Sequence, residues 1–196
     1  MSIRFQYNKT SLQVIEKQLK MRQRSLPTVK NKESALRMEV KRSKDEALRL
    51  HEQLEAEMAA YEKMSALWNE FDCSLVSVRD VRLSTVKIAG IRIPVLEDVL
   101  FAVQPYSLFN SPKWYPEGIR LLQSLARTGV AYEFCRMKTD LLEHARKKTT
   151  QKVNLFEKVQ IPGFEDAIRK IKRFMEDEEN LSKSSQKIMK TKILLG

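Results

Sequence analysis

The sequence predicts a mainly α-helical protein whose N- and C-terminal arms form a long antiparallel two-helix coiled coil. Three observations predict this: a heptad repeat fills the first arm, apolar stripes recur in the last part of the chain, and a short alternating stretch lies between them. The composition agrees, because 31% of the 196 residues are charged and only 42% are hydrophobic. We expect a small β-hairpin and a short helical segment between the arms, giving three parts: 1–72, 73–116 and 117–196.

The first arm, residues 1–72, carries the heptad pattern without a change of phase. Alternating steps of three and four residues from Leu12 give eighteen seam positions, of which four are polar: Arg22, Glu33, Ser43 and Glu57. At 1.5 Å per residue this helix is on the order of 90 Å long, so its apolar stripe needs a partner helix of similar length. Arg22 and Glu33 either set the register of the pair or reflect exposure near the helix end or local gaps in the seam.

A proline interrupts the most regular part of this arm. Pro27 removes a backbone hydrogen bond, at a cost of about 3 kcal/mol in a helix interior. Leu26 and Val29 nevertheless continue the heptad on either side. We therefore predict a single bent helix; the alternative is a break, with Pro27 at the start of a new helix.

The middle segment, 73–116, has a different pattern. The stretches "LVSVRDVRL" and "STVKIAGIRIPV" alternate as half-buried strands do, with Gly90 and Pro94 as interruptions. A proline-rich loop, "QPYSLFNSPKWYP", follows them. Trp114 and Tyr115 in this loop are either exposed for docking or buried beneath it. Trp68 and Phe71 are expected to pack the end of the first arm against the hairpin.

The second arm, 117–196, supplies the partner helix. Pro116 is typical of a first helical turn, and an apolar face follows it: Leu121, Leu125, Val130, Phe134, Met137 and Leu141. The stripe weakens and then resumes, shifted in phase, at Ile161, Phe164, Ile168, Ile171 and Met175.

The lengths of the arms predict a register. Residues 126–196 match the first arm in number, so a hairpin closed on that basis brings both termini to one tip. This register places Pro27 opposite Arg169 or Lys170, and Pro162 opposite Ala35 or Leu36.

The net charge of +11 is concentrated toward the start of the chain. Residues 1–50 hold 13 Lys/Arg and 5 Asp/Glu, whereas residues 51–100 hold 5 and 9. A basic end is typical of an acidic or nucleic-acid partner, or simply of a solvated helix face. No zinc-finger spacing or RNA-binding signature accompanies it, which disfavours nucleic acid. No signal-peptide core or membrane span is visible, so we expect a soluble, cytoplasmic protein unless a partner holds it at a membrane.

We predict no catalytic residue, no cofactor and no metal. The glycines allow no GxxxxGK[ST] phosphate-binding loop, and no nucleophile stands with a base and an orienting group. His51 and His144 come to similar heights in the hairpin, but two imidazoles without a carboxylate or thiolate cluster are a weak metal site. Cys73 and Cys135 are expected to be free thiols.

Three stretches carry a family resemblance. The start "YNKTSLQVIEKQLKMRQRSLPTVKNKESALRMEV", the middle "IAGIRIPVLE" and the return "KVNLFEKVQIPGFEDAIRKIKRFMEDEE" resemble the D subunit of the V/A-type ATP synthases and V-type ATPases. The return stretch is the most specific in spacing and residue type, through Val153, Asn154, Glu157, Ile161, Pro162, Ile168 and Ile171. The chain departs from the family pattern at Gly163 and in the diluted basic cluster "KKTTQK", which bears on contacts with the head rather than on the fold.

The resemblance implies a central-stalk rotor subunit that transmits torque between the ATP-converting head and the membrane ion-translocating rotor. It implies contacts with catalytic and non-catalytic head subunits (A and B), the small F subunit of the stalk and a funnel-like subunit on the membrane ring. It implies no catalysis by this chain, no nucleic acid and no direct insertion into the membrane. The alternative is a coiled-coil scaffold or a nucleic-acid-binding protein.

Candidate contact residues follow from the same resemblance. The head-contact candidates are Pro27, Lys30, Lys32, Arg37, Val153, Asn154, Glu157, Ile161 and Pro162. The candidates for binding the small stalk partner are Val86, Ile88, Ile91 and Ile93.

Overall fold

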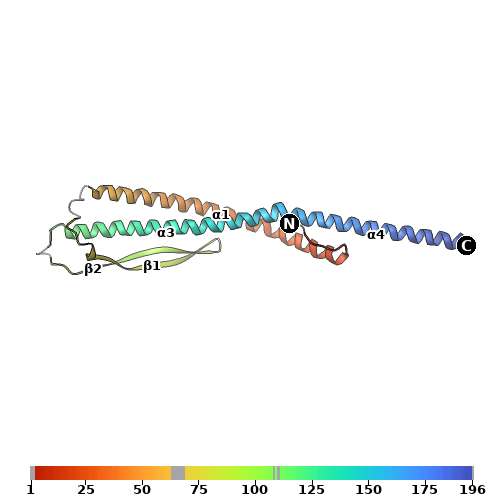
Figure 1. The fold of residues 1–196 in the computed structure, drawn as a ribbon, viewed down its shortest axis with the longest axis horizontal. Helices are drawn as coiled ribbons and strands as arrows, with labels where there is room; N and C mark the ends of the chain where they lie inside the picture. The colour runs from red at the N-terminus through yellow and green to blue at the C-terminus, as the bar shows by residue number, and fades with distance from the viewer. Residues whose placement is uncertain (1–2, 63–68, 108, 110, 196) are drawn as a thin grey trace. The chain divides into compact units, whose positions relative to one another are not determined.

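The computed structural model describes residues 3–62, 69–107, 109 and 111–195. Its elements follow in the order α1 (Lys9–Glu62), η1 (Cys73–Leu75), β1 (Val76–Ile88), β2 (Ile91–Val103), α3 (Tyr115–Asn154), η2 (Leu155–Gln160) and α4 (Ile161–Leu195) (Figure 1). The chain divides into two compact units, each described by itself: unit 1 is Met1–Glu33 with Lys148–Gly196, and unit 2 is Ser34–Lys147. The protein is mainly helical, with two long helices and a two-stranded antiparallel hairpin in the middle, as the sequence predicted.

Cross-helix pairs establish the antiparallel arrangement inside each unit. In unit 1, Glu16 pairs with Lys172 and Lys30 with Glu157, so numbers rise along α1 while they fall along its partner. In unit 2, ion pairs and hydrogen bonds between α1 and α3 follow the same order: Lys44–Glu143, Glu46–Lys138 and Glu57–Thr128.

The predicted seam of α1 faces inward. All fifteen heptad positions from Leu12 to Tyr61 are buried or half-buried, while most of the intervening residues are exposed. In unit 1, Ile15 packs with Phe164, Ala167 and Ile171. The phase of the heptad is therefore confirmed over the described length of α1.

The helix α1 runs through Pro27 without a break, which confirms a single helix over the alternative of two. The proline ring is exposed and sits in a turn where Ser25 donates its hydroxyl proton to the carbonyl of Met21, 2.7 Å away. Because Pro27 has no N–H, the carbonyl of Gln23 lacks its helical donor there.

A short π-helix, η2, joins α3 to α4 directly before Pro162. The Ile161 N–H donates to the carbonyl of Phe156, five residues back, which is the wide turn of a π-helix. Inward-facing positions in unit 1 step by seven from Thr149 to Phe156, by eight to Phe164 and by seven again to Ile171. The extra residue in the π-turn explains the phase shift seen in the sequence.

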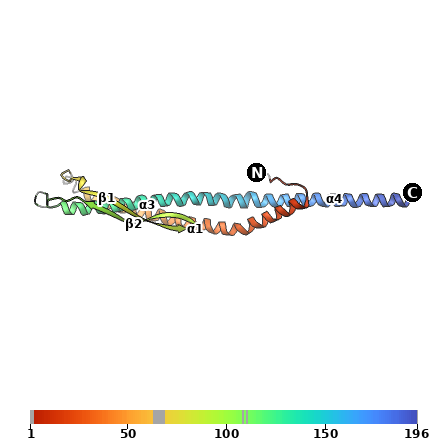
Figure 2. The ribbon, with the colours of Figure 1, turned by 90° about the horizontal axis from the view of Figure 1, so that it is seen from below.

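The hairpin is longer than the sequence indicated. Strands β1 and β2 have thirteen residues each, with β2 continuing to Val103. They pair in antiparallel register from Val76↔Val103 to Ile88↔Ile91. The turn residues Ala89 and Gly90 both have positive φ, 49° and 80°, as a type I′ turn requires. Both strands run alongside α3 within unit 2 (Figures 1 and 2).

Two clusters anchor the middle segment inside unit 2. Ile93 of β2 packs with Leu36, Val40 and Leu142, bringing the hairpin onto both helices. At the other end of the hairpin, a second cluster joins the end of the first arm to the start of α3 and includes Phe71, Leu75, Ile119, Trp114 and Tyr115. Trp114 and Tyr115 are half-buried against Phe71, as the burial alternative proposed. The expectation for Trp68 lies outside the described residues.

The predicted register was wrong by about ten residues, since Lys30 lies against Glu157 and Pro27 therefore does not face Arg169 or Lys170. Likewise, Leu36 packs with Leu142 rather than facing Pro162. The error arose because α3 begins at Tyr115, well before residue 126, so the helix pair closes earlier.

The early closure leaves the end of α4 without a helix opposite it among the described residues. Residues 176–193 are all exposed, whereas Ile3 and Phe5 pack near Phe164. The two ends of the described chain therefore do not lie together at one tip, and that prediction was wrong.

The apolar face expected on α3 was also partly wrong. Met137 and Leu141 are 44% and 46% exposed. The residues that α3 buries lie on a neighbouring face and are mostly small or polar: Gly118, Ile119, Thr128, Cys135, Thr139 and Leu142. A hydrophobicity criterion does not find a buried face of this composition.

Candidate functional site

The head-contact candidates of unit 1 gather around one ion pair between the helices. The Lys30 ammonium lies 2.8 Å from the Glu157 carboxylate, and both side chains remain about half exposed. Pro27 and Lys32 are exposed on the same stretch of α1. Because both side chains are exposed, their charges are accessible to a partner, and a pair of this kind contributes roughly 1 kcal/mol or less to stability.

The remaining candidates on the return helix divide by their burial. Val153 and Ile161 are half-buried, whereas their neighbours Asn154 and Pro162 are exposed. Arg37 is exposed but belongs to unit 2. The structure thus brings Lys30 and Glu157 into contact, and it places Arg37 in a different unit from the other head-contact candidates.

All four polar seam residues contact the opposite helix within their own unit. In unit 1, the Arg22 guanidinium lies 4.8 Å from the ring centre of buried Phe156, and Glu33 accepts a hydrogen bond from Thr150 at 3.1 Å. In unit 2, Ser43 and Glu57 bond to hydroxyl groups of α3. The polar residues of the seam therefore make contacts with the opposite helix and do not mark gaps in it.

Almost all of the net positive charge belongs to unit 1. Its residues include 19 Lys/Arg and 9 Asp/Glu, a net charge of +10, which leaves +1 for unit 2. Several lysines and arginines of α1 in unit 1 line a shallow surface hollow together: Lys17, Lys20 and Arg24. Such a surface attracts acidic partners through a field that salt screens within about 10 Å.

The four hairpin candidates differ in accessibility. Val86 is 44% exposed, Ile88 and Ile91 are half-buried, and Ile93 is fully buried against both helices. Val86 and Ile88 also line a groove of about 580 Å³ with charged residues of α1 and Lys138 of α3. Val86 is thus the candidate whose side chain a partner can reach, while Ile93 holds the hairpin in place.

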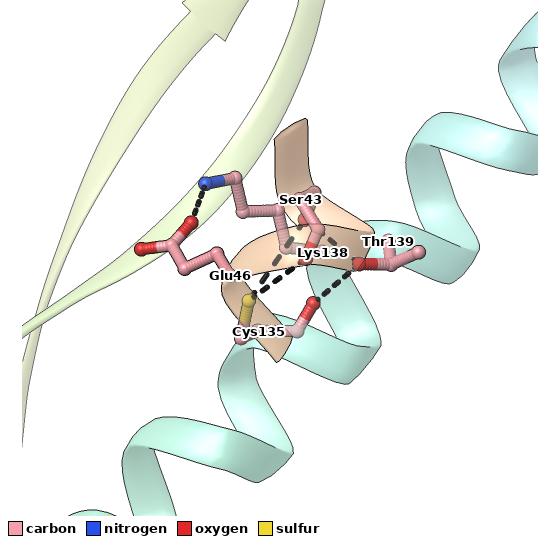
Figure 3. Close-up of polar contacts among 5 residues, drawn as sticks. All are labelled: Ser43, Glu46, Cys135, Lys138 and Thr139. Atoms are coloured by element: carbon pink, nitrogen blue, oxygen red, sulfur yellow. Dashed lines mark hydrogen bonds and ion pairs between the residues drawn. The ribbon is translucent and has the colours of Figure 1, made fainter. Parts of the chain in front are cut away.

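A buried polar cluster between α1 and α3 was not anticipated from the sequence as a cluster (Figure 3). The Ser43 and Thr139 hydroxyl oxygens are 2.7 Å apart, and the Cys135 thiol donates to the Ser43 carbonyl at 3.4 Å. Burial, with a smaller contribution from Glu46, raises the pKa of the Cys135 thiol. Ser43 stood out as a polar seam residue, but its partners on α3 could be found only with the correct register.

The described residues hold no group of three or more His, Cys, Asp or Glu side chains placed to bind a metal. His51 pairs with Glu55 at 3.3 Å and stacks on Tyr132, whereas His144 is exposed. Cys135 is a free, buried thiol. Within the same part of the chain, no helix is both long enough and apolar enough to cross a membrane.

Comparison with known proteins gives a consistent result along the chain. A family model, described as that of the ATP synthase D subunit, matches residues 11–191. The V-type ATP synthase D subunit of Borreliella burgdorferi is 29% identical over 95% of this chain and 93% of its own length. Proteins of the same name from Chlamydia muridarum and Chlamydia pneumoniae are 28% and 26% identical, covering 98% and 100% of this chain and 98% and 96% of their own lengths. With two long antiparallel helices, a central hairpin and a match of this extent, the chain belongs to the family of ATP synthase D subunits.

Proposed function

We propose that this chain is the central-stalk rotor subunit of a V/A-type rotary ATPase and transmits torque between the ATP-converting head and the membrane ion-translocating rotor. The observation that carries the proposal is the family match, which spans residues 11–191 and includes both long helices and the hairpin. Relatives of similar length are named as D subunits of V-type ATP synthases. The chain itself is a non-catalytic subunit, peripheral to the membrane on the cytoplasmic side.

The partners are the A and B subunits of the head, the small F subunit of the stalk and a funnel-like subunit on the membrane ring. Unit 1 is the part that contacts the head, because it has a net charge of +10 and exposes Lys32 and the Lys30–Glu157 pair. Screened charge contacts suit a surface that must move past several successive partners, since each contact is weak and reversible. The hairpin is the part that binds the F subunit, through exposed Val86 and the neighbouring groove.

Torque transmission requires differential contacts. A shaft couples to the head when its surface favours a different state at each catalytic interface. This coupling free energy is reciprocal: the shaft's orientation biases the states of the interfaces, and those states bias the shaft's orientation. The two helices of unit 1 each depart from a regular α-helix at one place. The first has Pro27 in its interior, and the return helix has a π-turn directly before Pro162. In this proposal, these local irregularities make the contacts differ around the axis.

A cross-linking experiment separates a rotor from a static scaffold. Lys32→Cys, joined to the head through a thiol reagent in the assembled ATPase, stops ATP hydrolysis, and reductive cleavage of the linker restores it. Val86→Cys, joined to the F subunit, leaves hydrolysis running because both partners turn together. Full hydrolysis with Lys32→Cys joined to the head would rule out a rotor.

A pull-down distinguishes the alternatives. A tagged chain recovers a large ATP-hydrolysing complex and a small partner from solubilised membranes. A coiled-coil scaffold would instead come down as its own oligomer without ATPase activity. A nucleic-acid-binding protein would bind duplex or single strands with steep salt dependence.

A further inference from the structure

The seam between α1 and α3 in unit 2 contains a polar site where apolar packing is expected. Ser43, Cys135 and Thr139 are 1%, 6% and 7% exposed, so water has little access to any of them. The other polar seam residues, Arg22, Glu33 and Glu57, are only half-buried. Ser43 is therefore the most buried of the polar seam residues, and its hydrogen bonds must come from the protein.

The donors and acceptors of this cluster match one another. Thr139 donates its proton to the Cys135 carbonyl at 2.8 Å, which leaves Ser43 as the donor in the 2.7 Å bond to the Thr139 oxygen. The Cys135 thiol donates to the Ser43 carbonyl at 3.4 Å. Each of the three side chains uses its single proton, and two of the three bonds cross between the helices (Figure 3).

The apolar part of the seam distinguishes registers poorly. Its residues on α1 repeat every seven positions, so a slide of one heptad replaces most apolar side chains of α1 by other apolar side chains. The polar cluster does not repeat in this way. Such a slide puts Leu36 or Leu50 into the space that Ser43 occupies beside Cys135 and Thr139.

Both size and polarity disfavour those slides. A leucine overpacks a space shaped for a serine. A slide that brings Leu50 to this place also moves the Ser43 hydroxyl against Leu142, whose side chain offers it no hydrogen bond across the seam. The cluster thus penalises a slip in each direction.

We propose that Ser43, Cys135 and Thr139 form a register clasp that fixes the axial alignment of α1 against α3. This proposal does not depend on the rotor function, since it concerns the isolated chain. Its consequence is that the two helices resist sliding past one another when force acts along them. The hairpin offers the competing explanation, because Ile93 contacts Leu36, Val40 and Leu142 and could fix the register alone.

The test traps registers as disulfides in the full chain carrying Cys73→Ser. Lys44→Cys with Glu143→Cys reports the native register, because the ion pair between Lys44 Nζ and Glu143 Oε2, at 3.4 Å, places these two positions opposite one another. Lys44→Cys with Arg136→Cys, and His51→Cys with Glu143→Cys, report slips of one heptad in the two directions. Cys135 is retained, and chains with one introduced cysteine measure any bond formed to it.

The decisive variant is Ser43→Ala with Thr139→Val, which removes the hydroxyls and nearly keeps the volumes. With the clasp intact, slipped disulfides form on the order of 10- to 30-fold less than the native one, as two cross-helix hydrogen bonds predict. The variant loses the Ser43–Thr139 bond but keeps the bond from the Cys135 thiol to the backbone carbonyl of residue 43. We therefore expect the ratio to fall to roughly three- to sixfold, while far-UV circular dichroism still shows a helical chain. An unchanged ratio in a helical variant would overturn the clasp and assign the register to Ile93 and its neighbours.

Two further variants complete the test. Ser25→Ala with Thr191→Val makes the same chemical changes where both hydroxyls bond only to their own helix, so its disulfide ratio stays native. If the double clasp variant fails to fold, Ser43→Ala alone is measured; it removes the same cross-helix hydroxyl bond, so a shift of similar size is expected in the same direction. A native ratio in a folded Ser43→Ala chain would then also refute the clasp.

Discussion

Replacing Pro27 by alanine should stabilise unit 1. The ring is exposed, so no packing is lost, and α1 is already helical on both sides. Alanine restores an N–H that reaches the Gln23 carbonyl, which gives a lower bound of about 1 kcal/mol for one hydrogen bond. The full difference between proline and alanine in a helix interior, about 3 kcal/mol, gives the upper bound.

Urea unfolding of the isolated chain, followed by circular dichroism, measures this gain. Thr28→Ala is the matched control, because it lies next in the same exposed turn and gains only the difference in helix propensity, about 0.5 kcal/mol. A gain for Pro27→Ala no larger than that of the control would refute the reasoning, since α1 would then carry no cost at the proline.

The same substitution bears on the rotor proposal. If the irregularities at Pro27 and Pro162 help to make the head contacts unequal, the double variant Pro27→Ala, Pro162→Ala is more stable but couples hydrolysis to rotation less tightly. Unchanged coupling in a correctly assembled complex would argue against that role for the prolines.

Three further outcomes follow from unit 2. Leu142→Ala should destabilise it by about 2–5 kcal/mol in urea unfolding, because the side chain is fully buried, whereas half-exposed Leu141→Ala costs much less. Ala89→Gly should stabilise the hairpin by several tenths of a kcal/mol, since φ of 49° is costly for alanine, and a loss would contradict the turn geometry. Lys44 holds the pKa of Glu143 below its usual value, so the stability that this pair contributes above about pH 4.5 is lost as acid protonates Glu143. The Lys44→Met chain should therefore show a flatter pH dependence of its unfolding midpoint below pH 5, and an unchanged pH dependence would contradict the assignment.

The sequence predicted the features of this fold that depend on local pattern. The heptad phase of α1 follows from periodicity alone, and the inward placement from Leu12 to Tyr61 agrees with it. The hairpin turn follows from Gly90 between alternating stretches. The same reasoning did not predict which candidate residues a partner can reach. Val86 and Ile93 come from the same alternating segment, yet Val86 is 44% exposed and Ile93 is fully buried.

The register and the buried face of α3 could not be predicted in the same way. Pro116 marked the start of α3 closely, but the predicted register came from matching the lengths of the two arms. That criterion assumes that both helices end together, whereas the end of α4 continues past the paired part of α1. The prediction of the buried face of α3 failed for a chemical reason. It buries Cys135 and Thr139 and exposes Met137 and Leu141, so hydrophobicity indicates the wrong side of the helix.

The π-turn has a consequence for how chains of this kind can vary in length. Its eight-residue step, from Phe156 to Phe164, absorbs one residue more than a heptad without turning the inward side of α4 away from α1. A deletion of one residue from Leu155–Gln160 would leave a regular α-helix with the same inward side. The same deletion one turn later would rotate every following side chain by about 100°. This junction is thus a place where the loss of one residue leaves the pairing of the helices intact.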